Sequence, residues 1–217
     1  MSEIDDIEKI GKNHLALAKI ETDAANSGLQ LAKVQTQKAK ASIQSFKIET
    51  SMAEIQAKYA QKAKKLSEQR INSKKKGLIE VPGESLSQEK EIAEYNERSA
   101  KNRTEAADIM EKIAEKELSI AKAKQGVAKM VLEVAKLRSN LGKKQLVYVD
   151  QVKANAPEEK KNKAKQAYLE IVKTITGKQK VIFKKKKEIA EKEKQLSDLN
   201  KKYANKLNEI VDIKIID

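Results

Sequence analysis

Apolar residues recur at most seventh positions in three long stretches of this chain, and its only two prolines, Pro82 and Pro157, separate those stretches. The three apolar lines begin at Ile20, Ile92 and Tyr168. A sustained seven-residue repeat keeps the same face of a helix apolar over many turns, which is typical of the seam of a left-handed coiled coil. The sequence therefore predicts an all-α fold, a long antiparallel helical hairpin or coiled coil with a third long helix, forming an elongated rod.

The larger apolar members of these lines form the predicted assembly seam. They are Ile20, Val34, Ile48, Ile55, Ile92, Ile113, Ile120, Val127, Val134, Leu141, Tyr168, Ile175, Ile182, Ile189, Leu196, Tyr203 and Ile210. The companion line in the third stretch starts at Val172 but continues with Gln179, Lys186 and Glu193. Each helix thus has one firm apolar line and a weaker flank, which favours packing in a hairpin or a small bundle.

Prolines and glycines set the expected boundaries within one elongated domain. We expect a first long helix over 1–76, a Pro-Gly connector over 77–86, a second helix over 87–155, and a third over 156–217 that ends in an apolar tail.

Local signals at the two breaks predict how the helices begin. Pro82 followed by Gly83 suits a type II turn, and Ser85 opens an S-x-x-Q capping box for the second helix. At the second break, Asn155 is the expected cap of a helix that starts with Pro157 and acidic residues.

Composition argues against catalysis. The 217 residues include no Cys and a single His, His14, so thiolate zinc sites, Cys nucleophiles and His-paired metal sites are excluded. The chain has no Gly-rich phosphate loop, no G-x-S-x-G and no H-E-x-x-H. We therefore expect no enzyme activity, catalytic residue, cofactor, metal site or small-molecule substrate.

The chain is strongly basic, with 46 Lys+Arg against 32 Asp+Glu and a formal net charge of +14. Two clusters supply the candidate anion-binding residues. These are Lys64, Lys65, Arg70, Lys74, Lys75, Lys76, Lys178, Lys180, Lys184, Lys185, Lys186 and Lys187. Four consecutive lysines surround a helix, so Lys184–Lys187 cannot all face one ligand, and a solvated face is the first interpretation. An anionic membrane surface and nucleic acid are the alternatives.

Two apolar ends are candidates for contacts between subunits. They comprise Leu78, Ile79, Val81, Leu86, Val211, Ile213, Ile215 and Ile216. The competing interpretation is that these residues cover the ends of their own bundle. A head-to-tail contact between subunits would produce open filaments unless it closed into a ring.

The plan of long helices resembles that of BAR-type membrane-bending modules and of ESCRT-III-like or phage-shock-type scaffolds. This likeness covers the general layout, and it transfers no functional residue. We predict a structural protein whose partner is itself, in a homo-oligomer of rods or filaments. The alternatives are a basic peripheral membrane scaffold and a non-specific nucleic-acid packaging protein. The acidic, interrupted N-terminal sequence and the absence of a long apolar run predict a cytoplasmic location, with leaderless export left open.

Overall fold

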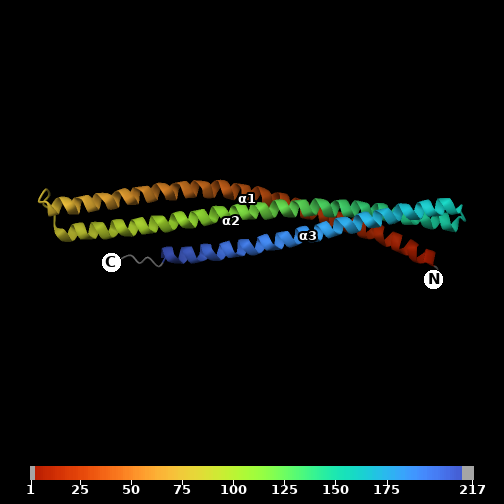
Figure 1. The fold of residues 1–217 in the computed structure, drawn as a ribbon. Helices are drawn as coiled ribbons and strands as arrows, with labels where there is room; N and C mark the ends of the chain where they lie inside the picture. The colour runs from red at the N-terminus through yellow and green to blue at the C-terminus, as the bar shows by residue number, and fades with distance from the viewer. Residues whose placement is uncertain (1–2, 212–217) are drawn as a thin grey trace. The chain divides into compact units, whose positions relative to one another are not determined.

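The computed structural model describes residues 3–211, and the side chains of residues 3–210. Three long helices follow one another along the chain, α1 (Glu3–Lys75), α2 (Gly83–Lys153) and α3 (Glu158–Val211), joined by two short connectors (Figure 1). No strand occurs among these residues. The predicted all-α fold is confirmed, whereas the supercoiling of the helices stays a prediction.

The three helices form two compact units. Within the described residues, unit 1 comprises residues 3–36 and 119–193, and unit 2 comprises residues 37–118 and 194–211. Each helix therefore contributes one segment to each unit, and each unit has a buried core of its own.

Helices α1 and α2 end in the same way, with one residue in the left-handed region. Gly77 has a φ of 70° and Asn155 a φ of 50°. The amide of Gly77 bonds to the carbonyl of Lys74 and the amide of Leu78 to that of Ser73, and the equivalent bonds link Asn155 to Val152 and Ala156 to Gln151. This is the Schellman motif, in which the left-handed residue satisfies the last carbonyls of a helix. Asn155 therefore ends α2, and its predicted role as the cap of α3 is wrong.

A proline comes directly before the first residue of α2 and of α3. The carbonyl of Pro82 accepts a hydrogen bond from Leu86 at 3.4 Å, and that of Pro157 accepts from Lys161 at 3.2 Å. A proline fits this position because the amide it lacks would have no partner there. The predicted type II turn is wrong, since Gly83 is already helical and Gly77 is the glycine with a positive φ among the described residues.

In unit 1, α1 and α2 pack through small residues. The buried line of α1 is spaced by seven and consists of Gly11, Ala18, Ala25 and Ala32. Glu8 contacts Lys153, His14 contacts Gln145 and Glu21 contacts Arg138, so residue numbers rise along α1 as they fall along α2. Small side chains allow two helix backbones to approach closely, and the buried Gly142 of α2 meets Gly11 here.

The contact of α3 with α2 in unit 1 uses larger side chains. The rings of Tyr148 and Tyr168 lie 5.6 Å apart at 58°, and Lys178 pairs with Glu133 further along α3. The bulky buried apolar residues of these two segments are Ile120, Val127, Val134, Leu141, Val149, Tyr168, Ile175, Ile182 and Ile189. The α2 segment is therefore covered by small residues on one side and by bulky ones on the other.

Unit 2 repeats this arrangement. Its α1 and α2 segments are joined by ion pairs of Lys47 with Glu111, Lys64 with Glu97 and Arg70 with Glu89. Its α3 segment is held by Lys206, which pairs with Glu105 of α2 at 2.5 Å. In contrast to unit 1, its buried apolar residues are mostly alanines, namely Ala39, Ala53, Leu86, Ala93, Ala100, Ala106, Ile113 and Ala114.

Candidate functional site: an exposed apolar stripe on α1

The predicted seam residues divide into three groups. Nine are buried, namely Ile113, Ile120, Val127, Val134, Leu141, Tyr168, Ile175, Ile182 and Ile189. Three are half-buried, namely Leu196, Tyr203 and Ile210. Five are exposed, namely Ile20, Val34, Ile48, Ile55 and Ile92. The seams predicted for the second and third stretches thus lie mainly inside the chain, whereas the seam predicted for the first stretch faces outward.

The outward face of α1 in unit 2 carries a regular apolar row, which we call the unit 2 stripe. It consists of Ile48, Met52, Ile55, Tyr59 and Leu66, each between 53 % and 67 % exposed. Four of its five members follow one another at alternating steps of four and three residues, the spacing of a coiled-coil seam. Single exposed apolar residues are normal on a protein surface, whereas a periodic row of them is a candidate interaction surface.

The stripe exists because the intrachain contact of α1 uses a different line. Ala53, which faces the core, is buried, while its neighbours Met52 and Ile55 are exposed. The stripe widens at one end, where Leu66 and Ile92 line a pocket of about 240 Å³ between α1 and α2. The alanine line was missed from the sequence, although the seven-residue spacing of Ala18, Ala25, Ala32 and Ala39 was a readable signal.

The predicted end contacts have different environments. In the first connector Leu78 is 71 % exposed and Ile79 and Val81 are half-buried, whereas Leu86 lies in α2 and is buried in unit 2. The side chains of Val211, Ile213, Ile215 and Ile216 lie outside the described residues. Leu78 is therefore the exposed apolar side chain among the described end residues.

The basic residues predicted in unit 2 are partly engaged by acidic neighbours. Lys64 donates to Glu97 at 2.7 Å, and this hydrogen bond and the charge of Glu97 raise the pKa of Lys64. Arg70 pairs with Glu89. Lys65, Lys75 and Lys76 are exposed and Lys74 is half-buried. An external anion would have to compete with these carboxylates for two of the six predicted residues.

The basic residues predicted in unit 1 lie on α3. Lys178 donates to Glu133 at 2.7 Å, which lowers the pKa of Glu133, whereas Lys180 and the run Lys184–Lys187 are exposed. The ammonium of Lys187 lies 4.9 Å from the ring centre of Phe183. Phe183 and Val181 are themselves exposed beside this run.

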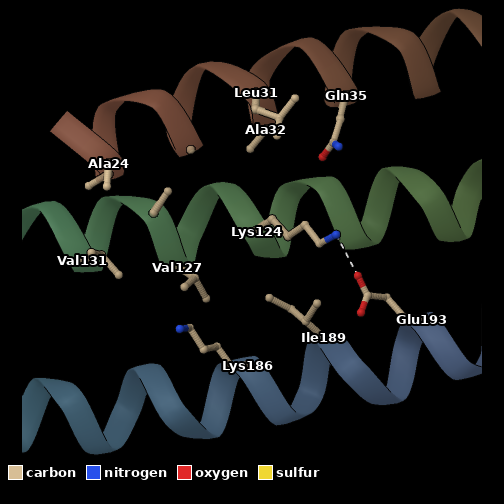
Figure 2. Close-up of a pocket in the computed structure, with 13 residues that line it drawn as sticks. Ala24, Leu31, Ala32, Gln35, Lys124, Val127, Val131, Lys186, Ile189 and Glu193 are labelled. Carbon is tan, nitrogen blue, oxygen red and sulfur yellow. Dashed lines mark ion pairs between the residues drawn. The ribbon is translucent and has the colours of Figure 1, made fainter. Parts of the chain in front are cut away.

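Unit 1 contains a groove of about 460 Å³ that all three helices line (Figure 2). Leu31 of α1, Val127 and Val131 of α2 and Ile189 of α3 make it mainly apolar. A 2.7 Å ion pair between Lys124 and Glu193 spans α2 and α3 beside it. The charged residues that line it are Lys124, Lys186 and Glu193.

His14 has a structural environment. Its Nδ1 lies 2.8 Å from Oε1 of Gln145, which is buried in the α1–α2 contact of unit 1. Among the described residues no cluster of three or more His, Asp or Glu side chains could hold a metal ion. His14 therefore helps to satisfy a buried amide between two helices.

No protein-family model matches this chain, and no curated protein matches it. Within the described part of the chain, no helix is both long and apolar enough to cross a membrane.

Proposed function

We propose that this chain is a non-enzymatic structural protein that self-associates into rods or filaments through coiled-coil contacts of α1. The observation that carries the proposal is the exposed row of apolar residues at heptad spacing on α1. Unit 1 has a similar row, formed by Leu17, Ile20, Leu31 and Val34. Burying such residues against a second helix removes apolar surface from water, a gross gain of about 25 cal/mol for each Å² that must exceed the entropy cost of association.

The exposed connector residue Leu78 is a second point of contact in this proposal. A contact made through the side of α1 joins chains laterally, whereas one made through the connector joins them end to end. Together they would support an extended assembly.

Sedimentation velocity over a wide range of protein concentrations, with no lipid or nucleic acid added, tests the proposal. We expect a concentration-dependent assembly, with rods or filaments in negative-stain electron microscopy. The fourfold variant Ile20→Lys, Val34→Lys, Ile48→Lys, Ile55→Lys should stay monomeric with unchanged helicity, because all four residues are exposed. A wild-type chain that is monomeric at every concentration would overturn the proposal.

A peripheral membrane role is the second candidate. The observation in its favour is that Val181 and Phe183 are exposed next to the exposed run Lys184–Lys187. Apolar side chains beside lysines suit the surface of an anionic bilayer. Cosedimentation with vesicles of phosphatidylserine, but not with vesicles of phosphatidylcholine alone, would support it. If the double variant Val181→Ser, Phe183→Ser still binds these vesicles, the exposed apolar pair is not the cause of membrane binding.

A further inference from the structure

The polar residues of the outward face of α1 restrict which helix can dock there. Ser45 and Lys62 occupy seam positions at either end of the apolar centre formed by Ile48, Met52, Ile55 and Tyr59, and both are exposed. A partner must therefore oppose apolar residues at the centre and tolerate a lysine at one end. The α1 helix of a second copy is a candidate partner. Its sequence is known, so each pairing of residues across the seam can be examined.

A parallel pairing of two copies is unfavourable. Equal positions then face each other, so that Lys62 of one copy opposes Lys62 of the other within the seam. Two like charges held close together in a partly desolvated layer repel each other.

One antiparallel alignment resolves this conflict. When Ile48 of one copy faces Tyr59 of the other, Met52 faces Ile55, and the polar residues Ser45 and Lys62 oppose each other. Shifting the alignment by one heptad places Lys62 against Met52 in one direction and against Lys38 in the other. The first alignment is therefore the one that matches apolar with apolar and polar with polar.

The residues that flank the seam agree with this alignment. In an antiparallel pair, the flanking positions of one helix meet the equivalent positions of the other. The alignment places Gln44 near Lys65, Ser51 near Lys58 and Glu49 near Gln56, and all six side chains are exposed. No like-charged pair forms among these contacts.

We infer that a second copy of this chain docks on the unit 2 stripe as a two-fold antiparallel dimer, with Ile48 of each copy against Tyr59 of the other. The inference rests on the proposed self-association and adds the surface, the direction and the register. Such an interface uses the same patch on both copies, so it closes on itself and forms a dimer as the unit from which any larger assembly is built.

Disulfide cross-linking tests the register. The chain has no cysteine of its own, so only the introduced cysteines can form a disulfide. The variants Ile48→Cys and Tyr59→Cys are oxidised separately and as an equilibrated mixture. We expect covalent dimers in the mixture alone. In the proposed dimer, position 48 faces position 59, so two copies of position 48 are offset by the difference of eleven residues, roughly 16 Å along the helix axis. A disulfide requires Cα atoms within about 7 Å.

A matched pair of variants tests the location. Ile20 and Ile48 are isoleucines on the exposed side of α1, 66 % and 63 % exposed, but only Ile48 lies in the proposed interface. Ile48→Lys should weaken the dimer at least about tenfold in Kd, and Ile20→Lys should leave Kd unchanged, with equal helicity in both. An equal loss from Ile20→Lys would overturn the proposed location.

The outcomes separate this inference from the proposed function. Covalent dimers formed by each single variant alone would indicate a parallel or shifted pairing, which overturns the register and leaves self-association intact. A wild-type chain that sediments as a monomer at every concentration overturns both.

Discussion

The carbonyl oxygen of Gly11 lies 2.7 Å from the point that a Cβ atom would occupy on Gly142, where α1 packs on α2 in unit 1. The side chain of Leu15 comes within 2.9 Å of the same point. The two backbones are therefore too close for any residue larger than glycine at position 142. This approach follows from the small residues that α1 presents to α2, because no bulky side chain holds the helices apart.

Gly142→Ala should lower the free energy of unfolding by about 1–2 kcal/mol, because the overpacking of a backbone contact outweighs the gain of about 1 kcal/mol in helix propensity. Thermal and urea denaturation followed by circular dichroism measure the change. Gly126→Ala is the control, since a Cβ at Gly126 meets nothing within 4 Å. That variant should be more stable than the wild type by about 0.5–1 kcal/mol. Equal stabilisation by both variants would contradict the close approach.

Gly77→Ala should lower the free energy of unfolding by about 1 kcal/mol, because an L-residue with a side chain is strained in the left-handed region. Gly77 has a φ of 70° and has open space around it, so the penalty comes from the backbone alone. Gly77→Asn should cost less, since asparagine tolerates this conformation and α2 already ends on Asn155. Denaturation midpoints of the two variants compare the costs, and an equal loss would contradict this cause.

The line from Tyr168 shows how much of the packing could be predicted from the sequence. Its bulky residues recur every seven positions and are all buried, namely Tyr168, Ile175, Ile182 and Ile189. Bulky apolar side chains at this spacing form one face of a helix, and such a face usually packs in a core. On α1 the heptad line of larger apolar residues is not the line that the chain buries. There the buried line is made of alanines, and the larger residues such as Ile48 lie outside.

This difference has a physical cause. Alanine is short enough to let α1 and α2 approach closely, so the intrachain contact needs no large side chain. The heptad line from Ile20 identifies an apolar face of α1. The sequence does not indicate whether this face packs against another helix of the same chain or against another molecule. The same holds for Asn155, since asparagine is favoured both at the start of a helix and in the left-handed residue after its end.

Ile182→Ala should lower the free energy of unfolding by about 2–5 kcal/mol, the usual range for removing a buried isoleucine side chain and leaving a cavity. Ile182 is 9 % exposed, whereas the adjacent Val181 is 45 % exposed. Val181→Ala is therefore the matched control, and we expect it to change the stability by no more than about 0.5 kcal/mol. Urea denaturation measures both, and equal losses would show that α3 does not bury this line against α2.

Glu8 provides a test of pH dependence. Lys12 donates to Glu8 at 2.6 Å, and Lys153 of α2 donates to the same carboxylate. These hydrogen bonds, followed by the lysine charges, lower the pKa of Glu8 from 4.5 to about 2. Because the folded value lies below the unfolded one, the carboxylate stabilises the fold above pH 4.5, and this contribution is lost as the pH falls from 4.5 toward 2.

Glu8→Gln should therefore lower the Tm at neutral pH, and the gap to the wild type should close as the pH approaches 2. Thermal melts at a series of pH values measure the gap. The background Lys12→Gln, Lys153→Gln is the control, because both donors are then absent. There, Glu8→Gln should shift the Tm by nearly the same small amount at every pH. If the gap in the wild-type background is independent of pH, the two lysines do not hold the pKa of Glu8 down.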